Sequence, residues 1–138
     1  MKTPIIMKQT LLTIALNSMT LLSIAQNAFT VSGKIKGEKA NGQIVKLWGN
    51  NGQTALGSAT IKNNTFEIKG KISEAELIRM TIAPAVDAAE STWRAANFYL
   101  DKGNITLSGA IDSLPTYYYK ANLPNVKPRI EGSQAQSL

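Results

Sequence analysis

The side chains that most often carry acid–base, nucleophilic and redox chemistry are missing from this sequence. Its 138 residues contain no histidine and no cysteine, which excludes histidine-dependent triads, cysteine nucleophiles, the usual zinc sites and thiol exchange. Carboxylates remain, and a pair of them can hydrolyse a glycosidic bond. The acids near the irregular part of the chain are Asp87, Glu90, Asp101 and Asp112. Because most of them have the neighbours typical of turns and surfaces, we predict no catalytic residue, no cofactor and no metal.

Aromatic side chains offer a different chemistry, because a ring can stack on a sugar or a peptide and loses little entropy on binding. The candidates for a ligand-facing platform are Trp48, Trp93, Tyr117 and Tyr119. In a regular strand, Tyr118 would point away from the face that Tyr117 and Tyr119 share. The competing interpretation is that these rings pack in the core and at sheet edges.

The elements that must position these residues follow from alternating apolar side chains. Residues 29–36 and 65–72 alternate apolar and polar residues, as half-buried strands do. Residues 43–49 and 54–61 form two further predicted strands. The Asn-Asn-Gly sequence at 50–52 joins them, and Asn-Gly is a strong hairpin signal because both residues tolerate positive φ.

Turn and breaker residues divide the middle of the chain. The two asparagines at 63–64 predict a turn, and Gly70 indicates a bulge or a close approach of backbone. Residues 77–83 are apolar except for one arginine and one threonine, which predicts a more buried strand that Pro84 ends. Residues 85–96 are rich in alanine, and we expect a short helix or an ordered excursion there.

The last strands are predicted from residue 97 onward. Residues 97–100 and 105–109 are expected to form a hairpin through a turn at 101–104, and prolines break the chain beyond Asp112. In all, seven or eight short strands with turn signals between them are predicted. They indicate an all-β protein, an antiparallel β-sandwich or a partly open barrel.

Residues 1–25 have the pattern of a secretory signal peptide. Two lysines precede a mostly apolar run at 11–25, which ends in the small-x-small pattern Ser-Ile-Ala. Cleavage is predicted between Ala25 and Gln26. A membrane anchor is the alternative, but a spanning helix needs about 20 apolar residues, and this run is shorter and interrupted by polar residues.

An exported chain with this composition points to one domain, residues 26–133, followed by a polar tail at 134–138. Of fifteen Lys and Arg residues, two lie in the predicted leader, which leaves a net charge of +4 against nine Asp and Glu. We expect a periplasmic or extracellular location, which makes nucleic acid an unsuitable partner for this mildly basic chain. No stable membrane span is expected after cleavage, and the oligomeric state is left open.

Several segments, in order, resemble one known family. They read FTVSGKI at 29–35, NNTFEIKG at 63–70, FYLDKGNITLSG at 98–109 and IEGS at 130–133. Together they resemble the β-rich domain of unknown function 4369, which precedes thioredoxin-like domains in exported Bacteroidetes proteins. The likeness covers about residues 29–133. The family often has glycine before the phenylalanine strand, where this chain has Asn-Asn-Thr.

The resemblance implies a non-catalytic accessory or interaction module, whose partner would be a thioredoxin-like domain in cis or in trans. No catalytic residues are known for this module, so none is carried over. A thioredoxin-like domain uses a Cys-x-x-Cys pair, which this sequence lacks. Any oxidoreductase activity would therefore reside in a thioredoxin-like domain outside this sequence.

Two further hypotheses remain open. A small glycan- or peptide-binding protein is the alternative function, with a ligand at the aromatic residues or at the excursion around 85–96. A hydrolase that uses only carboxylates is a weaker third alternative. In addition, Asp-Ser-Leu at 112–114 resembles the O-glycosylation signal of the same bacterial group, which predicts a glycan on Ser113.

Overall fold

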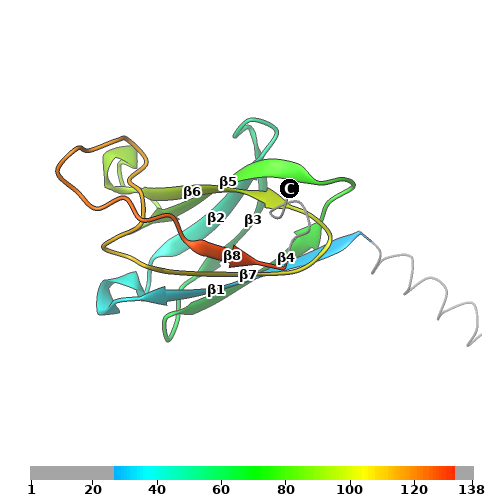
Figure 1. Ribbon diagram of the computed structural model, residues 1–138, viewed down its shortest axis with the longest axis horizontal. Coiled ribbons are helices and arrows are strands. Elements are labelled where there is room, and N and C mark those ends of the chain that lie inside the picture. Colours follow the sequence, from blue (N-terminus) through cyan, green and yellow to red (C-terminus); the bar gives the residue numbers. More distant parts are fainter. Residues whose placement is uncertain (1–26, 133–138) are drawn as a thin grey trace, which may run out of the picture.

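The computed structural model describes residues 27–132, and these form two stacked four-stranded sheets (Figure 1). All neighbouring strands are antiparallel except β1 and β7, which are parallel. The prediction of an all-β sandwich with eight strands is confirmed, and the sheets do not close into a barrel. The first sheet has the order β4 (Thr65–Lys71), β1 (Ala28–Lys36), β7 (Gly103–Ala110), β8 (Arg129–Glu131), and the second has the order β3 (Thr54–Thr60), β2 (Ile44–Gly49), β5 (Glu76–Ala83), β6 (Arg94–Leu100).

The core lies between the two sheets because successive residues of a strand point to opposite faces. In β1, Phe29, Val31 and Ile35 are almost completely buried, whereas Lys34 and Lys36 are exposed. Strands β2, β4, β6 and β7 show the same alternation. The buried residues form one apolar cluster, and burying each large side chain stabilises the fold by roughly 1.5–3 kcal/mol.

On the inner face of the first sheet, glycines let large side chains of the neighbouring strand approach the backbone. A Cβ atom on Gly33 would lie 1.9 Å from the Cε1 atom of Phe66, so the ring occupies the space that a side chain would fill. At Gly70 a Cβ atom would lie 2.7 Å from the Cζ atom of Phe29. The close approach predicted at Gly70 is therefore observed, and its cause is an aromatic ring of the partner strand β1.

The turn at residues 63–64 carries the chain from the second sheet to the first. Asn63 and Asn64 have φ values of 51° and 62°, a conformation that asparagine adopts more readily than most residues. The Asn64 side chain donates hydrogen bonds of 2.8 Å to the carbonyls of Ile35 and Gly37. Its backbone N–H donates to the Oδ1 atom of Asn41 at 2.7 Å. Asn64 thus ties the turn to the end of β1.

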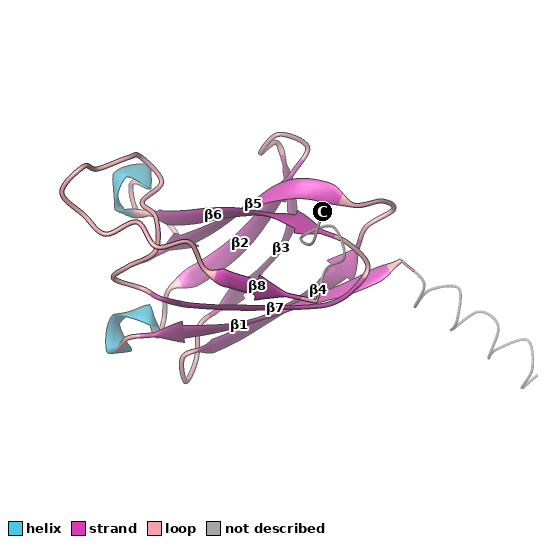
Figure 2. Ribbon diagram, viewed as in Figure 1, coloured by secondary structure: helices cyan, strands magenta, loops and turns pink. Residues whose placement is uncertain are grey.

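Two sequence expectations need correction or refinement. The predicted hairpin through residues 101–104 is wrong, because β6 and β7 belong to different sheets and the turn crosses between them. Turn residues reverse the chain, but distant strands decide its pairing, and β7 pairs with β1 instead. The excursion after Pro84 is present, without an α-helix. It contains a single 3-10 turn, Glu90–Thr92, which lies at the same end of the sandwich as the other one, Glu38–Ala40 (Figure 2).

The two turn asparagines provide a matched test of the side-chain bonds. Replacing Asn64 with glycine keeps the positive φ but removes two hydrogen bonds, so Asn64→Gly should lower the free energy of unfolding by about 1–2 kcal/mol. No side-chain hydrogen bond of Asn63 occurs within residues 27–132, and Asn63→Gly should change stability by less than about 0.5 kcal/mol. Urea denaturation of the two variants measures this difference. Equal losses would contradict the role assigned to Asn64.

Candidate functional site

The outer face of the second sheet carries the first group of candidate residues. Leu47 and Met80 fill the core, so the alternating residues Trp48 and Arg79 point outward. These two residues are cross-strand partners on β2 and β5. The Trp48 indole N–H donates a 3.0 Å hydrogen bond to the Thr81 hydroxyl. The Trp48 side chain is half-buried, and this bond holds it in one orientation against the outside of the sheet.

Two loops extend over this face and bring further rings to it. Trp93, just before β6, donates its indole N–H to the Ala88 carbonyl at 3.0 Å. Tyr117 packs against Trp93 edge to face, with ring centroids 5.4 Å apart and planes at 74°. The backbone N–H of Tyr117 also donates to the Trp93 carbonyl at 2.9 Å. We call Trp48, Arg79, Trp93 and Tyr117 the Arg79 face.

A second set of contacts joins the two loops. The Tyr118 hydroxyl donates to the Oε2 atom of Glu90 at 2.6 Å, and the Lys120 ammonium donates to the Ser91 carbonyl at 3.0 Å. The two segments lie side by side at one end of the sandwich (Figure 1). The hydrogen bond to Glu90 raises the pKa of Tyr118 above its ordinary value of 10.0, with smaller contributions from desolvation and charge. These two hydrogen bonds hold together the loop that carries Trp93 and the loop that carries Tyr117.

Arg79 lies at the centre of the face. Its Nε atom donates to the Oδ1 atom of Asn97 at 3.3 Å, and its guanidinium carbon lies 5.5 Å from the Tyr117 ring centroid. A second cation lies nearby, because the Lys46 ammonium is 4.9 Å from the Trp48 ring centroid. Both contacts fall within the range of cation–π attraction.

The surface around Arg79 and Trp48 is hollowed in several adjoining places. One hollow of about 200 Å³ is lined by all four residues of the Arg79 face together with Thr81 and Glu90. A second, of about 320 Å³, extends from Trp48 and Arg79 to Leu77. A third, of about 210 Å³, lies between Trp48, Trp93 and Lys46. Three hollows that share Trp48 in their lining therefore lie on this side of the sheet.

The structure brings together three of the four aromatic residues named from the sequence. Trp48, Trp93 and Tyr117 line the same hollow, whereas Tyr119 is 81% exposed and does not. The alternation of a regular strand does not apply to the tyrosines, because residues 117–119 form a loop, where Tyr118 packs against Tyr117 with ring centroids 5.0 Å apart. Sequence reasoning missed Arg79 as a site residue, although a lone charge in an apolar strand was the available signal.

The acids considered for catalysis have separate surroundings. The Asp101 carboxylate accepts the backbone N–H of Lys102 at 2.8 Å, as a turn residue does. Glu90 accepts the Tyr118 hydroxyl, and Asp87 and Asp112 are exposed. Between residues 27 and 132, no cluster of three or more potential metal-ligating side chains occurs.

The remaining predicted positions lie in a loop or beyond the described residues. Ser113 is half-buried, and its backbone donates to Ala110 at 3.0 Å and accepts from Val126 at 2.7 Å. Its glycosylation stays a prediction. The predicted leader with its cleavage site at Ala25 and Gln26, and the tail at 134–138, lie outside the described residues.

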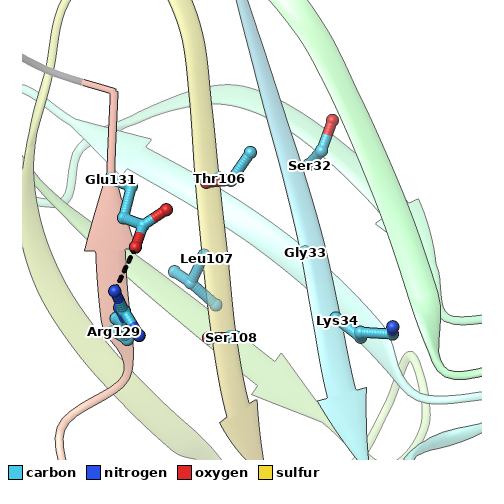
Figure 3. Close-up of a pocket in the computed structure, with 8 residues that line it drawn as sticks. All are labelled: Ser32, Gly33, Lys34, Thr106, Leu107, Ser108, Arg129 and Glu131. Atoms are coloured by element: carbon cyan, nitrogen blue, oxygen red, sulfur yellow. Dashed lines mark ion pairs between the residues drawn. The ribbon is translucent and has the colours of Figure 1, made fainter.

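The outer face of the first sheet offers a different surface (Figure 3). A groove of about 380 Å³ crosses β1, β7 and β8 and is lined by Lys34, Arg129 and Glu131 together with Leu107 and small or hydroxyl residues. Arg129 and Glu131 are 2.7 Å apart in an exposed ion pair, an arrangement that contributes little energy. The groove has no aromatic residue in its lining, so the Arg79 face is the stronger candidate site.

The fold and the site define an all-β sandwich with an aromatic, basic surface outside its core. Comparison with known families also identifies the family of the chain. The model of the family described as Domain of unknown function (DUF4369) matches residues 29–138, and the chain belongs to that family. This confirms the family resemblance. No curated protein and no solved structure matches the chain. Over residues 27–132, no helix has the length and apolar character needed to cross a membrane.

The raised pKa of Tyr118 gives a test of the bond that joins the loops. Because the folded-state pKa lies above the unfolded value, this bond stabilises the fold below about pH 10 and is lost as the pH rises through the folded-state pKa. Glu90→Ala should lower the pKa of Tyr118 towards its ordinary value, and Asp87→Ala in the same loop should not. Ultraviolet titration measures tyrosinate formation, and subtraction of Tyr118→Phe assigns it. An unchanged pKa in Glu90→Ala would contradict the assigned cause.

Proposed function

We propose that this protein is an exported, non-catalytic interaction module that binds its partner through the Arg79 face. One observation carries the proposal. Three rings from separate parts of the chain gather around a single arginine on the solvent side of a sheet. The core lies on the opposite side of that sheet, so core packing does not account for this gathering.

The preorganisation of the rings supports a binding role. Hydrogen bonds to Thr81 and Ala88 hold the indoles of Trp48 and Trp93, while Tyr117 packs against Trp93. Side chains that are already ordered lose little further entropy when a ligand binds. Amphipathic rings that offer a wide contact surface are common in such sites.

The residue types support a non-catalytic role. The chain has no histidine or cysteine, and the carboxylate of Glu90 is engaged by Tyr118 in the wall of the site. The family has no described function. On this proposal, oxidoreductase activity would belong to a thioredoxin-like domain to which the module is joined or which it binds.

Binding of a glycan or a peptide is the second candidate function, and the hollows between the rings favour it. Hollows of about 320 Å³ and 210 Å³ adjoin Trp48, and small ring-shaped or planar groups can occupy such spaces. A thioredoxin-like partner would instead cover the whole face. The two candidates share the same surface and differ in the size of the ligand.

Substitution of Trp93 tests the interaction surface. The predicted mature chain is probed with a glycan array, a peptide array and a purified thioredoxin-like domain. Trp93→Ala should weaken whichever interaction is found by about tenfold, which is about 1.4 kcal/mol. Tyr119→Ala removes an exposed ring outside the face and should leave it unchanged.

Circular dichroism and thermal unfolding check that both variants are folded. Turnover of an arrayed glycan by the wild-type chain would contradict the non-catalytic role. Binding that Tyr119→Ala weakens and a folded Trp93→Ala does not would contradict the location of the site. Absence of binding to all three probes would overturn the proposed function.

A further inference from the structure

We propose that the Arg79 face binds a sugar that carries a carboxylate, with Arg79 as the anchor for that group. This inference rests on the proposed function and names its ligand class. The Arg79 guanidinium is exposed at the centre of the face, and only its Nε atom has a hydrogen bond to another described residue. Its two terminal nitrogens form a planar fork, which matches the two oxygens of a carboxylate.

The surroundings hold this fork in place without neutralising it. The bond to Asn97 and the contact with the Tyr117 ring restrict the guanidinium from two sides. The ion pairs within residues 27–132 are formed by Lys69 with Glu67 and by Arg129 with Glu131, at other places on the surface. Arg79 therefore faces the hollows with its charge unpaired by a carboxylate of the described chain.

The charge of the hollows favours an anion. Arg79 and Lys46 line them, and the one acidic side chain in their lining is Glu90. The Glu90 carboxylate already accepts the Tyr118 hydroxyl. A ligand that brings a negative charge next to Arg79 would complement this surplus of positive charge.

The geometry favours a sugar over a peptide. An extended peptide commonly binds by adding to a sheet edge, where free backbone groups pair with it. The Arg79 face lies over β2 and β5, and both are internal strands whose backbones pair on each side. These two strands therefore present only side chains to the face. Its rings can pack against the carbon–hydrogen face of a pyranose, while Asn51 and Asn97 supply groups that bind hydroxyls.

Ligand pairs that differ only in charge test the inference. The probes are oligogalacturonate, sialyllactose and oligomannuronate, each paired with its methyl ester. Isothermal titration calorimetry and tryptophan fluorescence measure binding to the predicted mature chain. At least one acid should bind, and about tenfold or more tighter than its neutral counterpart.

Variants of Arg79 assign the preference to one side chain. Arg79→Gln should remove the preference for the acid, and Arg79→Lys, which keeps the charge but loses the fork, should restore only a small part of it. The matched control is Arg129→Gln on the other sheet, which should bind like the wild type. Arg79 is exposed, so these variants are expected to fold, and thermal unfolding checks this.

The outcomes separate this inference from the proposed function. Equal binding of acid and neutral forms, or an acid preference that Arg79→Gln retains, overturns the carboxylate anchor. Binding of a peptide or a neutral sugar that needs Trp93 but not Arg79 overturns the inference and leaves the proposed function standing. Absence of binding to every sugar, peptide and domain probe overturns both.

Discussion

The packing of apolar side chains between the two sheets is the constraint on which the rest of the structure depends. β1 pairs with both β4 and β7, and its apolar side chains enter the core between the sheets. Gly33 and Gly70 leave the space that the rings of Phe66 and Phe29 occupy. A side chain at either glycine would force these rings to move within a closely packed interior. The inner face of the first sheet thus packs closely because side chains are absent at these two positions.

This packing also determines which residues face solvent on the second sheet. Because Leu47 and Met80 are fully buried, the strand pleat directs Trp48 and Arg79 outward. A register shift of one residue would reverse both faces and expose the core. The burial of the inner face and the composition of the Arg79 face therefore have a single cause. Neither Trp48 nor Arg79 has a positive φ, so ordinary strand backbone is sufficient to place both side chains on this face.

The loops that cover the second sheet convert a flat face into a hollowed one. Tyr118 and Lys120 bond to the Glu90–Thr92 turn, and Tyr117 bonds to Trp93, so the two loops support each other. The first sheet has no comparable cover in its groove, where Arg129 is paired with Glu131. In a family whose function is undescribed, this difference makes the Arg79 face the stronger candidate for a binding surface.

The sequence by itself determined the local elements and the limits of the chemistry. Alternation located the strands, Pro84 ended β5, and the asparagines at 63–64 formed the predicted turn. These features depend on the residue and its neighbours, which the sequence contains. The absence of histidine and cysteine is likewise a property of composition, and the order of the motifs was sufficient to identify the family.

Tertiary structure alone decided which elements meet. Residues 101–104 have the composition of a hairpin turn, yet β7 joins β1 because the pairing of strands depends on distant residues. Trp48, Arg79 and Tyr117 are far apart in the chain, and only the packing of the sheet and its loops places them around one hollow. Tyr119 separates from Tyr117 because their segment is a loop, in which the strand period no longer sets direction.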